Sequence, residues 1–210
     1  MKAQIWTLPT RIFHWLLAIG FASAYVLSDF EDLNRFHFAF GAFVGSLAFF
    51  RIIFGFIGPK YSHFRDFPIG IKKIVQFIKT FRDKTKTYIG HNPAAAVVML
   101  GILITAVLCG TSGYLFYGVK SHAFDLGISR GSMKEIHEIF ANLFLILVAV
   151  HFLGVIIDNI FHKNVGTFSS IFNGKKNVES ENIQLNSSQK IFSIAGLLIS
   201  LIVFWLAYNL

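Results

Sequence analysis

The chain has 210 residues, of which 54% are apolar and only 14% are charged. Soluble domains average roughly 25% charged residues, so this composition excludes a disordered chain and an ordinary soluble enzyme. In a soluble protein the formal charge of +8 would suggest nucleic acid as a partner, but the apolar content argues against it. A single cysteine, Cys109, excludes an internal disulfide.

Five apolar stretches approach the roughly 20 residues that a helix needs to cross the hydrocarbon layer. They cover about residues 12–28, 36–57, 93–116, 136–161 and 191–208. We therefore predict an all-α membrane protein. We expect residues 1–172 to form a four-helix transmembrane bundle, 173–190 to be a flexible polar linker, and 191–210 to be an additional C-terminal transmembrane helix.

A short amphipathic helix is predicted between the second and third stretches. Its apolar residues recur at helical spacing over about 67–82, with lysines around them: Phe67, Ile71, Ile74, Ile78 and Phe81. This pattern is typical of a helix that lies in the membrane interface. A docking surface for a cytoplasmic partner is the alternative.

The distribution of lysine and arginine predicts the orientation. The N-terminus and the second and fourth connections carry 14 of these residues, whereas the first and third connections carry 4. Because basic residues collect in cytoplasmic loops, we expect a cytoplasmic N-terminus and, after five crossings, a periplasmic C-terminus. The charge then reports orientation and contact with anionic lipid.

Four histidines lie inside the predicted spans: His14, His37, His137 and His151. Ionisable groups at membrane depth are costly and tend to be functional. His137 and His151 are fourteen residues apart, so they share one helix face but are separated by roughly 21 Å. One metal ion cannot use both, whereas two cofactors can. Matching depths pair His37 with His137 and His14 with His151.

Two b haems are the cofactors that suit these pairs, because an apolar bundle offers a dry slot and imidazole suits iron. A haem with two axial histidines can pass electrons but has no open iron position. There are two alternatives: in one, each histidine is a core residue bonded to a carbonyl; in the other, the set belongs to a haem-free, histidine-lined metal transporter.

Neighbouring residues fit haem slots. Arg51 lies fourteen residues after His37, and Arg11 precedes His14 by nearly one turn. Both are candidates to pair with haem propionates, although Arg11 also suits snorkelling to the interface. Gly41 and Gly45 permit the close approach of either a flat ring or another helix.

A quinone site is predicted at the start of the third span, where His91 and Asn92 precede Pro93. A quinone (menaquinone or ubiquinone) needs an apolar slot, hydrogen-bond partners and a proton route to water. The alternative is structural, since Asn followed by Pro is also a typical helix N-cap.

The motifs together resemble the bacterial cytochrome b561 and nickel–iron hydrogenase b-subunit family. The resemblance covers about residues 5–175 and rests on Arg11-Ile12-Phe13-His14-Trp15, His37 with its glycine-rich helix and Arg51, Gly90-His91-Asn92-Pro93, Ser112-Gly113, His137 and His151. It departs from the family's pattern at the fifth span and at Ala94-Ala95-Ala96.

The resemblance implies a di-haem cytochrome b in a bacterial inner membrane, with His14, His37, His137 and His151 as the iron ligands. It also implies a quinone-contacting role for Asn92. Such a protein exchanges electrons between quinone and a redox partner: a hydrogenase, another oxidoreductase or a c-type cytochrome. We expect a respiratory-chain subunit rather than an independent enzyme. A quinone reductase with a small outer-face donor such as superoxide is the alternative.

Overall fold

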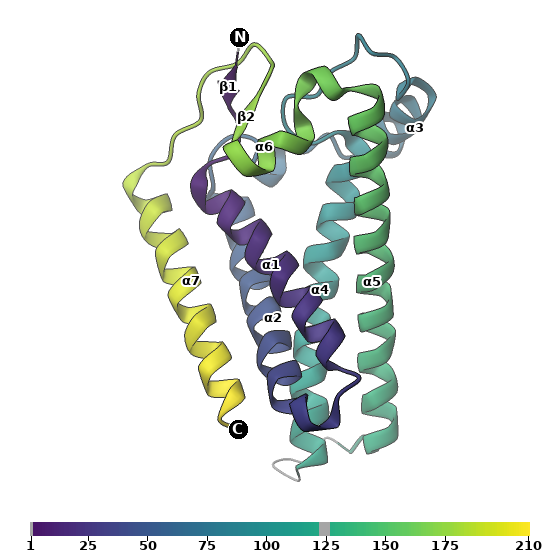
Figure 1. The fold of residues 1–210 in the computed structure, drawn as a ribbon, viewed down its shortest axis with the longest axis vertical. Coiled ribbons are helices and arrows are strands. Elements are labelled where there is room, and N and C mark those ends of the chain that lie inside the picture. Colours follow the sequence, from purple (N-terminus) through teal and green to yellow (C-terminus); the bar gives the residue numbers. More distant parts are fainter. Residues whose placement is uncertain (1, 122–126) are drawn as a thin grey trace. The chain divides into compact units, whose positions relative to one another are not determined.

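The computed structural model describes residues 2–121 and 127–210, so His122 lies outside the described residues. Five long apolar helices dominate it (Figure 1): α1 (Leu8–Leu27), α2 (Asn34–Ile57), α4 (Pro93–Lys120), α5 (Arg130–Phe161) and α7 (Ser187–Tyr208). Each is long and apolar enough to cross a membrane. The five predicted spans are therefore confirmed.

The remaining elements of the described chain are short. They are the strands β1 (Ala3–Gln4) and β2 (Lys175–Lys176), the helices α3 (Ile71–Thr80) and α6 (Thr167–Asn173), and three turns of 3₁₀ helix at Glu31–Leu33, Phe64–Asp66 and Lys163–Val165. β1 precedes α1, and the others lie between the long helices along the chain.

The amphipathic helix α3 is shorter than predicted. Pro68 lacks a backbone N–H, and Gly70 has a φ of 144°, which only glycine adopts readily. The helix therefore begins at Ile71, and Phe67 is buried before it, with its ring 4.8 Å from that of His91. Ile71 is 82% exposed, as expected for a helix whose apolar side faces lipid.

The chain divides into two compact units. The first comprises Met1–Ile12, Ile53–Gly101 and Leu147–Ser193, and the second comprises Phe13–Ile52, Ile102–Ile146 and Ile194–Leu210. The five long helices each contribute a segment to both units. The first unit holds fourteen of the lysine and arginine residues, and the second holds the other five.

The core of the first unit is built around a two-stranded sheet. β1 pairs antiparallel with β2, so that Ala3 lies opposite Lys176. Ile5, Trp6 and Val178 are buried beside it. The predicted polar linker therefore begins with an ordered strand, which places the buried Lys176 in this core.

The second unit packs α7 against α2. Its core contains Phe43 and Leu47 of α2, and Phe204 of α7 packs against them. The hydroxyls of Ser46 and Ser200 lie 3.0 Å apart, which adds a polar contact between the two helices. The fifth helix is thus attached through α2.

Glycines bring α2 and α4 together in the same unit. A Cβ added to Gly45 would lie only 3.2 Å from the Cα of Gly110. Gly45 therefore serves helix packing, one of the two roles expected for it. A Cβ added to Gly41 would meet nothing within 4 Å, so its space is open.

Candidate functional site

His37 and His137 are brought together in the second unit. Their ring centres lie 6.2 Å apart and their planes are nearly perpendicular, at 86°. Imidazole nitrogens bind metal ions at about 2.0–2.1 Å, so two rings on opposite sides of one ion have centres roughly 6 Å apart. The separation matches that of a pair of axial ligands.

Each ring is oriented by a backbone carbonyl. His37 Nδ1 lies 2.7 Å from the oxygen of Ala24, and His137 Nδ1 lies 3.1 Å from the oxygen of Cys109. A carbonyl oxygen only accepts hydrogen bonds, so each Nδ1 carries the proton. Nε2 of each neutral ring then has its lone pair available for a metal, which is the usual arrangement of ligating histidines.

The surroundings of this pair fit a haem. Gly41, one turn after His37 on the same face of α2, leaves open space where a side chain would stand. Gly113 of α4 lies against the other ring, because its added Cβ would be 3.1 Å from Cε1 of His137. The hydroxyl of Ser112 is also 3.2 Å from Nδ1 of this ring.

The number of ligands argues for haem over a bare metal ion. Among the described residues, no group of three or more His, Cys, Asp or Glu side chains could hold a metal ion. Structural zinc takes four protein ligands. Haem iron needs only axial ligands from the protein, since the porphyrin supplies the other nitrogens, so two imidazoles suffice.

The other predicted haem residues are divided between the units. His14 lies in the second unit and His151 in the first, and both are half-buried. Their pairing stays a prediction. His137 and His151 do lie on one unbroken helix, α5, as the fourteen-residue spacing requires.

The two candidate propionate partners have different environments. Arg51 is only 5% exposed within the apolar helix α2. A buried guanidinium can form charge-assisted hydrogen bonds with a carboxylate, which is compatible with the propionate role. Arg11 donates through Nη1 to the carbonyl oxygen of Phe172, near the C-terminus of α6. This contact fits a positive charge at a helix C-terminus.

The start of α4 combines a helix cap with an aromatic cluster. Asn92 Oδ1 accepts a hydrogen bond of 2.8 Å from the N–H of Ala95, which confirms the N-cap. Its Nδ2 is the remaining donor. The ring of His91 lies between those of Trp6 and Phe67, at centre distances of 4.9 and 4.8 Å. The apolar walls and the amide donor are features that a quinone site needs.

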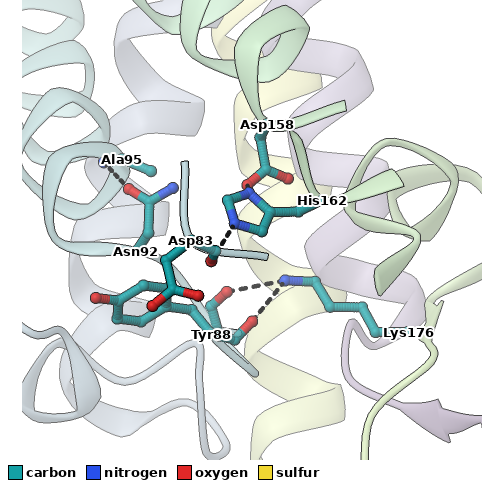
Figure 2. A network of polar contacts seen from close by, with 8 residues as sticks. Asp83, Tyr88, Asn92, Ala95, Asp158, His162 and Lys176 are labelled. Carbon is teal, nitrogen blue, oxygen red and sulfur yellow. Dashed lines mark hydrogen bonds and ion pairs between the residues drawn. The ribbon is translucent and has the colours of Figure 1, made fainter. Parts of the chain in front are cut away.

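Sequence reasoning missed a polar network beside this segment (Figure 2). Lys176, 2% exposed, donates from Nζ to the carbonyl oxygens of Gly90 at 2.9 Å and of Tyr88 at 3.4 Å. Burial lowers the pKa of Lys176 to about 8, although the charge of Asp158 acts in the opposite direction. No local pattern marks a two-residue strand that pairs with the N-terminus.

The comparison with known families agrees with this architecture. The sequence model of the prokaryotic cytochrome b561 family matches residues 5–174. No curated protein and no solved structure matches the chain. The matched region includes four of the long helices and all four intramembrane histidines. The chain therefore belongs to the prokaryotic cytochrome b561 family and is a multi-pass membrane b-type cytochrome of electron transfer.

Proposed function

We propose that the protein holds two b haems and passes electrons between membrane quinone and a redox partner protein. The partner is a hydrogenase, another oxidoreductase or a c-type cytochrome at the outer face of a bacterial inner membrane. The observation that carries this proposal is the pair His37 and His137. Their ring centres lie 6.2 Å apart, and Nδ1 of each ring is hydrogen-bonded to a backbone carbonyl.

His37 and His137 hold the outer haem, and His14 and His151 hold the inner one. When bound, a b haem supplies a reversible one-electron carrier. The chain fixes the imidazole orientation through the carbonyls of Ala24 and Cys109. A haem iron bound by both histidines of a pair would have no position left open to small molecules.

Arg51 and Arg11 neutralise the propionates of the inner haem. The strongest support concerns Arg51, whose guanidinium is 5% exposed in an apolar helix. A propionate beside it would offset the cost of burying this charge. Arg11 already donates to the carbonyl of Phe172, so its propionate contact would use the remaining N–H groups.

Quinone binds at the start of α4, where Asn92 donates from Nδ2 to a quinone oxygen. His91, between the rings of Trp6 and Phe67, forms the adjacent wall. Oδ1 of Asn92 is occupied by the cap, so the amide is held with its N–H groups directed away from the helix. This fixed donor orients the quinone ring.

The basic residues support the orientation. The first unit, which contains the start of α4, holds fourteen of the nineteen lysine and arginine residues. Basic segments face the cytoplasm. The N-terminus and the quinone site are then cytoplasmic, and the His37–His137 pair lies toward the periplasm and the redox partner.

The proposal is tested with purified protein reduced by dithionite and mixed with decylubiquinone. We expect the reduced b-haem band to disappear on mixing, and expect Asn92→Ser to slow this step while the haem content stays unchanged. Serine retains the N-cap but lacks the amide donor. A wild-type band that persists in excess quinone would refute the quinone reaction.

A second set of variants tests the ligand pairs. Replacing His37 or His137 with alanine should remove the same haem, with the same change in the optical spectrum. Replacing His14 or His151 should remove the other. Loss of the outer haem in His14→Ala would contradict the pairing.

A further inference from the structure

Asp158 and His162 form a half-buried polar pair at the end of α5 (Figure 2). Nδ1 of His162 lies 3.4 Å from Oδ1 of Asp158, one helical turn earlier. The side chain of His162 is only 10% exposed and that of Asp158 only 19%. A carboxylate and an imidazole in contact at this burial form a pair that can hold and pass a proton.

Asp158 lies on the side of the pair that is nearer to His151. Asp158 follows His151 by seven residues, so it lies on the same face of α5, roughly 10 Å further along the axis. Its Oδ2 is buried and has no hydrogen-bond partner among the described residues. An oxygen in this state can bind or release a proton without breaking another hydrogen bond.

The imidazole of His162 contacts a chain segment that is followed by exposed residues. Nε2 of His162 lies 3.4 Å from the backbone oxygen of Asp83. The residues that follow, Lys84, Thr85 and Lys86, are all exposed. The carboxylate of Asp83 is turned to Thr85, whose hydroxyl and N–H hold its pKa below the usual value. The His162 ring thus lies between Asp158 and a backbone carbonyl that is followed by an exposed segment.

Lys176 connects this pair to the segment that precedes Asn92. Its ammonium donates to the carbonyls of Tyr88 and Gly90, and its charge interacts with that of Asp158. The positive charge offsets a negative Asp158 and holds the chain just before His91 and Asn92. Lys176 is therefore a positioning residue for Asp158 and for the segment that precedes Asn92.

We propose that Asp158 and His162 carry protons between cytoplasmic water and quinone bound beside Asn92. This proposal rests on the quinone reaction proposed above. Reduction of quinone to quinol takes two electrons, which come from the b haem, and two protons. For each proton the O–H bond of Asp158 breaks and an O–H bond forms on a quinone oxygen, so Asp158 is reprotonated once between the two transfers. The Asp158 carboxylate takes a proton from Nδ1 of doubly protonated His162. The ring keeps the Nε2 proton that it donates to the Asp83 carbonyl, and cytoplasmic water reprotonates Nδ1. Quinol oxidation runs these transfers in reverse.

Three matched variants test the proposal. Asp158→Asn and His162→Gln remove the proton carriers with little change in shape, and Glu179→Gln removes an exposed carboxylate of the same unit. The reduced proteins are mixed with decylubiquinone while haem oxidation and, with a pH dye in weak buffer, proton uptake are followed. Quinone affinity is measured separately from the concentration dependence of the rate.

We expect Asp158→Asn and His162→Gln to slow haem oxidation and proton uptake together by about 100-fold, within the range of general acid–base catalysis. The haem spectrum and the quinone affinity should not change. Formate, a small weak acid, should restore part of the rate in Asp158→Asn. Glu179→Gln should behave as the wild type.

Three results would overturn the proposal, and they distinguish its failure from that of the quinone site. If Asp158→Asn matches Glu179→Gln in rate and proton uptake while the wild type reacts, the pair is only structural and the quinone site stands. The same conclusion follows if haem oxidation in Asp158→Asn is slow, formate does not restore it, and the variant binds quinone more weakly. If the wild type does not react with quinone, both proposals fail.

Discussion

The buried Lys176 predicts an unusual dependence of stability on pH. Its ammonium is 2% exposed, beside the ring of Trp6, with the carbonyls of Tyr88 and Gly90 as acceptors and Asp158 as the neighbouring acid. Burial lowers its pKa from 10.5 to about 8 in the folded protein. The unfolded chain therefore binds more protons between these two pH values, so stability should rise as the pH increases across this window.

The magnitude follows from the shift. A difference of about 2.5 units corresponds to about 3 kcal/mol once both states are neutral, and about 2 kcal/mol of this is gained between pH 7 and roughly pH 9.5. A chain of this size shifts its melting temperature by about 2–4 °C per kcal/mol. Lys176 should thus contribute about 4–8 °C over this interval.

The assay is thermal unfolding in detergent at several pH values for the wild type, Lys176→Met and the exposed control Lys175→Met. The Lys176 variant also loses the donor to two carbonyls, so the change with pH is compared rather than absolute stability. Titration of the other lysines is common to all three proteins. Equal pH dependence in the wild type and Lys176→Met would refute the reasoning, whereas Lys175→Met should follow the wild type.

Three glycine substitutions test the haem site and the attachment of α7. Gly113→Ala should displace the His137 ring, which its Cβ would meet at 3.1 Å, and should lower the content of one haem; an unchanged spectrum would contradict this geometry. Gly41→Leu should also lower haem content, although no protein atom lies within 4 Å of the added Cβ. Full haem content there would mean that no porphyrin uses this space. Gly196→Val should loosen α7, because its Cβ would lie 3.0 Å from Phe50, and lower the melting temperature while both haems remain. Haem loss in this variant would make α7 part of the haem-binding bundle.

Much of the fold could be predicted because membrane spans have strong signals. Twenty apolar residues are unmistakable in any sequence, and the five spans agree with the structure within a few residues at most ends. The fourteen-residue spacing of His137 and His151 placed both on one helix face from periodicity alone. Depth then paired His37 with His137, which the structure brings together.

Other features depend on contacts that sequence spacing does not encode. The carbonyls of Ala24 and Cys109 orient the two rings, but a backbone oxygen is present at every position and carries no residue signal. The pairing of β1 with β2 joins residues more than 170 positions apart through two-residue strands. In the sequence, Lys176 is therefore indistinguishable from the other basic residues of a polar linker.

The amphipathic helix illustrates a partial success. The apolar period correctly predicted α3, but it also included Phe67, which precedes Pro68 and Gly70. These two residues end the periodic segment, and Phe67 packs on His91 instead. Periodicity identifies a helix face, whereas proline and glycine set its limits.

The haem-to-chain ratio of the purified protein tests the central claim most directly. Expressed with ample haem and quantified by the pyridine haemochrome spectrum against total protein, the wild type should contain two b haems per chain. His37→Ala and His137→Ala should each contain one. A ratio of one in the wild type, or a colourless protein, would contradict the account of two haems held by four histidines.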